Sequence, residues 1–139
     1  MKTDPEALIR QLFTVLEARD LPAALAMFSD DAVIYDPHYP IPTMKGTAAI
    51  ERGLTWGLGT LSQMGFTVNR VWVDGTHCAV EVDTHHVLNN GMKLDFEQVF
   101  LFETQGDRIT HLRSFVPYPP PGIGGWISTV TGWWWKLRG

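Results

Sequence analysis

Residues 92–103 read MKLDFEQVFLFE, and this stretch decides the fold class. Apolar and polar side chains alternate along it with a period of two, which is typical of a β-strand buried on one face. The even-numbered side chains are apolar with one exception, an amide. We therefore predict that the face turned to the core consists of Met92, Leu94, Phe96, Gln98, Phe100 and Phe102.

Three further strands are expected around this one. They are predicted over residues 66–73, 77–88 and 108–116, because the same alternation recurs between turn signals. The Asp74-Gly75 pair is a strong signal for a tight hairpin. The last half of the chain is therefore expected to form an antiparallel meander.

Helical spacing of apolar residues precedes the strands. Asp4 followed by Pro5 begins the first predicted helix, and Asp20 caps a second, shorter helix that ends at residues 29–31. A third helix is expected to begin at Gly46. Helices followed by a meander predict an α+β fold, with three N-terminal helices packed on one face of a curved antiparallel sheet.

A short strand is predicted over residues 32–35, between the second and third helices. Asp36-Pro37 ends it, because proline disfavours continued regular structure at the preceding residue. Residues 38–45 carry further prolines and are expected to form a rigid loop. Asp36 is in phase with the inward side chains of this strand, so it either looks into a cavity or simply starts the turn.

The composition of the 139-residue chain limits its class. Hydrophobic residues make up 45% and charged residues 19%, which predicts one globular domain with a core. The net charge of -4, without a lysine or arginine cluster, argues against nucleic-acid binding. The single cysteine excludes an intrachain disulfide and a cysteine-based metal site. We predict neither a metal nor another cofactor.

No apolar stretch is long enough to span a bilayer. The first ten residues contain no apolar core of a secretion signal. These observations predict a cytoplasmic protein.

The strand predicted over residues 77–88 places Thr84 and His86 on its inner face and His85 on its outer face. Adjacent side chains on a strand diverge, so the two histidines do not readily chelate one metal. An inward histidine is either a hydrogen-bonded core residue or a residue of a functional site. Ser114 is expected to face inward on the last strand.

Gln98 requires a hydrogen-bond partner, because a buried amide without one costs roughly 1–3 kcal/mol. Two interpretations remain open at this point. The amide bonds to the backbone or to trapped water, or it contacts a ligand in a pocket.

The order of the elements and two blocks of sequence resemble the nuclear transport factor 2-like superfamily, which includes the SnoaL-like polyketide cyclases and ketosteroid isomerase. The similarity covers residues 5–117 and implies a cone-shaped, cystatin-like α+β barrel formed by a single domain over residues 1–121. The blocks that carry it are residues 30–37 with 45–50, and residues 94–102 with Arg108-Ile109 after the turn.

The resemblance implies roles for individual residues. Asp36 matches the general base of ketosteroid isomerase, which moves a proton next to a carbonyl while an oxyanion hole holds the enolate. Leu12 stands where that hole has a tyrosine, and Gln98 stands where it has a protonated aspartate. Leucine cannot donate a hydrogen bond, so His86 or Tyr39 is a candidate substitute donor. The predicted catalytic residues are Asp36, Gln98 and His86.

The aromatic side chains expected in the cone suit a flat hydrophobic ring system. We predict an isomerase or cyclase that acts on a steroid-, terpenoid- or polyketide-like substrate. The alternatives are a non-catalytic module that binds a lipophilic ligand, and an epoxide hydrolase, for which no second inward acid is found. The predicted substrate-binding residues are Leu12, Tyr39, Trp72, Thr84, Phe96, Phe100 and Ser114.

Residues 122–139 lie beyond the resemblance and hold four of the six tryptophans, together with Lys136 and Arg138. Three interpretations compete. The segment caps the open end of the cone or a dimer seam, or it anchors the protein peripherally to a membrane surface, or it is disordered. Proteins of this resemblance commonly form homodimers, so a homodimer is also predicted.

Overall fold

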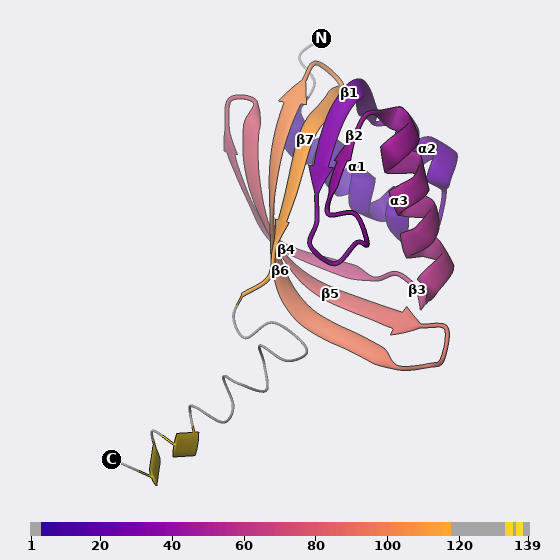
Figure 1. Cartoon of the computed structure of the whole chain (residues 1–139). Helices are drawn as coiled ribbons and strands as arrows, with labels where there is room; N and C mark the ends of the chain where they lie inside the picture. The colour runs from indigo at the N-terminus through magenta and orange to yellow at the C-terminus, as the bar shows by residue number, and fades with distance from the viewer. Residues whose placement is uncertain (1–3, 118–132, 135, 138–139) are drawn as a thin grey trace.

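The structure is a computed structural model that describes residues 4–117, 133–134 and 136–137. Three helices gather on one side of a strongly curved sheet (Figure 1). The helices are α1 (Pro5–Glu17), α2 (Leu21–Ala26) and α3 (Thr47–Thr60). The strands are β1 (Phe28–Tyr35), β2 (Thr43–Lys45), β3 (Leu61–Gln63), β4 (Phe66–Asp74), β5 (His77–Leu88), β6 (Lys93–Gln105) and β7 (Arg108–Phe115).

The first two helices begin where the sequence predicts. The Asp4 side chain accepts a hydrogen bond from the backbone N–H of Glu6, and the Asp20 side chain accepts one from Ala23. A proline in each first turn needs no hydrogen-bond acceptor there. Capping therefore sets both starting points locally.

The strand order is β2-β1-β7-β6-β5-β3, with β4 also paired to β5. The meander β4–β7 is antiparallel, as predicted, but β1 pairs with β7 in parallel. The sheet is therefore mixed, and the purely antiparallel expectation was wrong at this one pair. The cone-shaped α+β architecture is confirmed.

Two strand predictions near the N-terminus were incomplete. Residues 29–31 were expected to end a helix, but they belong to β1, which begins at Phe28. Pairing with β7 extends the strand: Phe28 lies opposite Ile109, and the Ile109 N–H donates to the Met27 carbonyl at 2.8 Å. The loop predicted over residues 38–45 includes β2, which pairs with the end of β1.

The alternation in the long strands is confirmed. On β6 the residues from Leu94 to Phe102 at even positions are buried or half-buried. Met92 lies before the strand and is 56% exposed. Phe13 of α1 connects the helices to this face, because its ring contacts those of Phe66, Phe100 and Phe102.

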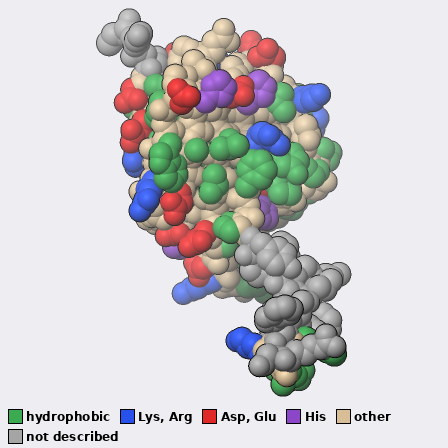
Figure 2. Space-filling model, turned by 90° about the vertical axis from the view of Figure 1, so that its left-hand side faces the viewer, with side chains coloured by type: hydrophobic (Ala, Val, Ile, Leu, Met, Phe, Trp, Pro, Cys, Tyr) green, Lys and Arg blue, Asp and Glu red, His purple; other side chains and the backbone are tan. Residues whose placement is uncertain are grey.

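A band of hydrophobic side chains crosses the face of the molecule seen in Figure 2. Large exposed hydrophobic residues on the strands include Trp72, Leu101 and Phe115. An exposed apolar area of this kind is common at protein contacts. The homodimer stays a prediction.

No helix among the described residues combines the length and the hydropathy that a membrane crossing requires. Most of the segment 122–139 lies outside the described residues. Its three interpretations, and the domain boundary at residue 121, stay predictions.

Candidate functional site

A cavity of about 650 Å³ lies between the helices and the inner face of the sheet. Its apolar wall includes Phe13 and Leu54 from the helices and Phe66 from the sheet. The predicted site residues that line it are Leu12, Asp36, Tyr39, His86, Phe96, Gln98 and Phe100. The structure thus brings seven of the ten together.

Trp72 does not line this cavity, so its assignment to the substrate site is corrected. It is 51% exposed and borders a second, smaller hollow. The pairing of β4 with β5 shifts register between Val68 and Arg70. An extra residue at such a bulge inverts the alternation that follows it, which turns Trp72 outward.

Thr84 and Ser114 are fully buried and contact Gln98 instead of lining the cavity. The Thr84 hydroxyl donates to Gln98 Oε1 at 2.5 Å, and Gln98 Nε2 donates to Ser114 Oγ at 2.8 Å. These three residues form a polar row across β5, β6 and β7. Neighbouring side chains therefore satisfy the amide, and the second N–H of Gln98 has no partner among the described residues.

Asp36 follows β1 and lies in a turn that its own backbone closes. Its N–H donates to the Pro42 carbonyl at 2.9 Å, and its carbonyl accepts from the Tyr39 N–H at 3.2 Å. Its Oδ1 accepts from the His38 N–H at 3.0 Å and lies 2.8 Å from His38 Nδ1. Asp36 thus both lines the cavity and starts the turn, so the two interpretations of this residue hold together.

His86 enters the cavity from β5. Burial, and then the nearby His38, lower the pKa of its imidazole from 6.5 to about 4, although Asp36 opposes the shift. The Gly65 N–H donates to His86 Nδ1 at 3.3 Å. A neutral ring that accepts at Nδ1 carries its proton on Nε2, so His86 is a hydrogen-bond donor at neutral pH.

Tyr39 lies on the same side of the cavity as Asp36. Burial, and then the charge of Asp36, raise the pKa of its hydroxyl well above the usual value, so the phenol is neutral. Its ring contacts Trp56 of α3 at a centroid distance of 5.6 Å. One carboxylate and two neutral donors therefore line the same apolar cavity.

A model of the family described as SnoaL-like domain matches residues 9–112. The chain belongs to the SnoaL-like domain family. The resemblance inferred from the sequence is thus confirmed. A comparison with curated proteins finds no match.

Solved structures share the fold of this SnoaL-like domain. One is a protein from Catenulispora acidiphila with a ketosteroid isomerase-like fold, in complex with trimethylamine (TM-score 0.73, 18% identity, 84% of this chain and 88% of that one). Another is Rv0760c from Mycobacterium tuberculosis in complex with estradiol-17β-hemisuccinate (TM-score 0.73, 17% identity, 84% of this chain and 96% of that one). A third is the epoxide hydrolase/cyclase-like enzyme SalBIII of salinomycin pyran-ring formation (TM-score 0.72, 18% identity, 82% of this chain and 91% of that one).

His38 and Trp56 are among the cavity residues of this SnoaL-like domain that the sequence analysis did not assign to the site. The available signal for His38 was its position two residues after Asp36, because a residue at this spacing in a turn can contact the side chain of the residue that starts the turn. Nothing in the sequence singled out Trp56, because its helix is only weakly amphipathic.

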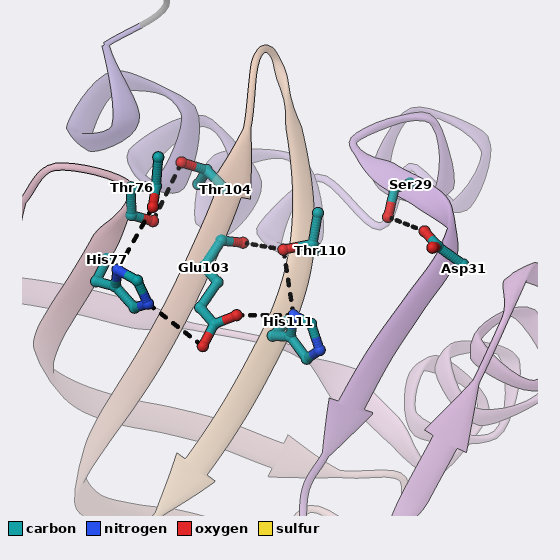
Figure 3. A network of polar contacts seen from close by, with 8 residues as sticks. All are labelled: Ser29, Asp31, Thr76, His77, Glu103, Thr104, Thr110 and His111. Carbon is teal, nitrogen blue, oxygen red and sulfur yellow. Dashed lines mark hydrogen bonds and ion pairs between the residues drawn. The ribbon is translucent and has the colours of Figure 1, made fainter.

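A second cluster of titratable residues lies on the other side of the sheet (Figure 3). Glu103 of β6 stands between His77 and His111, with nitrogen–oxygen distances of 3.5 and 3.0 Å. All three side chains are about half exposed or more. Within the described residues no group of three or more histidine, cysteine or acidic side chains is arranged to hold a metal ion.

Gly57 of α3 gives Tyr39 its place in the SnoaL-like domain. A β-carbon at residue 57 would lie 2.9 Å from the Tyr39 hydroxyl oxygen, whereas one at Gly59 would meet nothing within 4 Å. We expect Gly59→Ala to raise the free energy of unfolding by up to about 1 kcal/mol. Gly57→Ala should not raise it and should weaken ligand binding by displacing Tyr39. Denaturant unfolding and a binding titration on both variants check this, and an equal gain in stability would contradict it.

The low pKa of His86 predicts a loss of stability in acid. The folded state keeps this ring neutral, whereas the unfolded chain protonates it below pH 6.5, so stability falls as the pH drops from 6.5 to about 4. The expected loss is on the order of 1–3 kcal/mol after allowance for partial solvent exposure. Denaturant unfolding across this range should show a flatter pH profile for His86→Gln than for wild type.

Proposed function

We propose that this SnoaL-like domain is an enzyme that moves a proton on a hydrophobic, ring-bearing substrate, of the isomerase or cyclase type. The observation that carries the proposal is the position of Asp36. Its carboxylate lines an apolar cavity together with two neutral hydrogen-bond donors, His86 and Tyr39. Such an arrangement supplies a general base and hydrogen-bond donors for the negative charge that develops on the substrate when the base removes a proton.

The substrate class follows from the walls of the cavity. A volume of about 650 Å³ falls in the range of small-molecule sites, and leucine and phenylalanine side chains dominate the lining. Two proteins with this fold support the same class. One is bound to an estradiol derivative, and the other has a role in pyran ring formation in the polyether salinomycin.

The proposed reaction begins when Asp36 removes a proton from a carbon beside a carbonyl group. The electron pair moves to the carbonyl oxygen, and hydrogen bonds to this oxygen stabilise the enolate. The available donors are His86 Nε2–H, the Tyr39 hydroxyl and the remaining Gln98 N–H. Asp36 then returns the proton to another carbon, or the enolate attacks an electrophile within the substrate and closes a ring.

Leu12 favours a second candidate, a module that binds a lipophilic ligand without reaction. This side chain is buried in the wall and offers no hydrogen bond where ketosteroid isomerase has a tyrosine. One missing oxyanion donor costs a factor of about 10²–10³ in rate. The epoxide hydrolase alternative is weaker, because Asp95 and Glu97 border the cavity with exposed side chains.

The experiment that tests the proposal follows proton exchange and double-bond isomerisation of a β,γ-unsaturated ketosteroid. Wild type and Asp36→Asn are compared at equal concentration. Turnover by wild type that Asp36→Asn lacks supports the enzyme. Binding of the steroid without turnover in either protein would contradict it and favour the binding module.

A further inference from the structure

Asp36 is held by one residue at two points. The backbone N–H of His38 donates to Asp36 Oδ1 at 3.0 Å, and the Nδ1 atom of the same residue lies 2.8 Å from that oxygen. A carboxylate oxygen only accepts, so the ring nitrogen is the donor. Both contacts fall on Oδ1, and no described residue bonds to Oδ2. The pair therefore fixes the direction in which the second oxygen points.

The two side chains differ in their exposure to water. The Asp36 side chain is 13% exposed and that of His38 is 34% exposed, although both line the cavity. The His38 ring also contacts the ring of Phe96, with centroids 5.4 Å apart. The imidazole thus lies between the Asp36 carboxylate and the Phe96 ring, and it is more exposed to solvent than the carboxylate.

We propose that His38 is the positioning residue of Asp36, and that protonation of His38 turns the proton-transfer step off. This inference rests on the proposed function. The neutral imidazole holds Oδ1 and leaves Oδ2 for the substrate. The imidazolium would place a positive charge beside the carboxylate, which stabilises the anion and makes it a weaker base.

Other titratable groups at the cavity belong to several elements and bear on the same step. They are Tyr39 in the loop, His86 on β5, and Lys93, Asp95 and Glu97 on β6. Only His38 makes a described hydrogen bond to Asp36 through its side chain.

Two variants separate positioning from direct proton transfer. His38→Asn can place an amide N–H near the position of Nδ1 but cannot take up a proton, whereas His38→Leu offers no side-chain donor. We expect His38→Leu to lose about 10- to 100-fold in kcat on the ketosteroid, with His38→Asn within about threefold of wild type. Equal loss in both variants would overturn the proposal, because the imidazole itself would then carry the proton.

The dependence of kcat on pH distinguishes a protonation switch at His38 from a purely structural role, which would leave this dependence unchanged. Relative to its own rate at pH 8, His38→Asn should retain several-fold more kcat at pH 5 than wild type does. The same acid decline in both proteins would show that His38 does not control Asp36, and so would overturn the switch.

A measurement without substrate keeps this inference distinct from the proposed function. In ¹⁵N-histidine-labelled full-length protein above pH 8, NMR should find the His38 proton on Nδ1, because the hydrogen bond selects that tautomer. Asp36→Ala should move the proton largely to Nε2. His111, which bonds to Glu103, should be unaffected and serves as the control. A His38 ring that carries its proton on Nε2 in wild type overturns the inference, whereas absence of turnover overturns only the proposed function.

Discussion

Asp36→Asn should slow turnover of a β,γ-unsaturated ketosteroid by about 10²–10⁴-fold, the usual contribution of a positioned general base. The amide has the shape of the carboxylate but does not take up a proton. Its oxygen can still accept from the His38 N–H, so the turn that closes at Tyr39 and Pro42 should persist. The steady-state rate and solvent deuterium incorporation measure the effect.

The matched control for this variant is Asp83→Asn, which makes the same chemical change on the outward side of β5. The rate of Asp83→Asn should lie within about a factor of two of the wild-type rate, because substitutions on the surface usually have small effects. Steroid affinity should change little in Asp36→Asn, because apolar surface provides most of the binding. A rate equal to wild type would remove Asp36 from the mechanism.

Phe13→Ala should lower the free energy of unfolding by about 3–5 kcal/mol, the usual cost of deleting a buried phenylalanine side chain. Phe13 is 3% exposed. Its ring lies 4.9 Å from that of Phe66, 5.3 Å from that of Phe100 and 6.2 Å from that of Phe102. The substitution therefore removes the contact between α1 and two strands at once.

Denaturant unfolding measures this loss, and a thermal scan should show a fall in Tm of roughly 10–20 °C. Phe115→Ala is the control, because this ring is exposed on β7 and contacts only Tyr35 and Arg113 among the described rings and cations. It should cost about 1 kcal/mol or less. Equal losses in the two variants would show that the aromatic cluster does not hold the helices on the sheet.

The strands of the meander could be predicted because their signal is local. Side chains alternate across a strand whatever surrounds it, so the inner faces of β5, β6 and β7 follow from the spacing alone. The same reasoning failed at Trp72, because a bulge in β4 interrupts the alternation. A bulge depends on the partner strand, which a period of two does not reveal.

The candidate site could be predicted in part. Asp36 could be identified because it ends a strand in phase with the inward side chains, and Gln98 because it is a polar residue on an apolar face. The partners of Gln98 were not predictable as partners, because Thr84 and Ser114 come from two other strands. His38 was not assigned to the site, because its place two residues after Asp36 indicates a turn but not the hydrogen bond that its side chain makes there.

The α+β class, the capped starts of α1 and α2 and the inward faces of the long strands could be derived from the sequence, because each depends on residues a few positions apart. The parallel pairing of β1 with β7, the outward orientation of Trp72 and the presence of Asp36, His86 and Tyr39 in one cavity became known from the folded structure. These depend on contacts between distant segments. Their energies are settled by packing and burial in the folded chain, which no local pattern records.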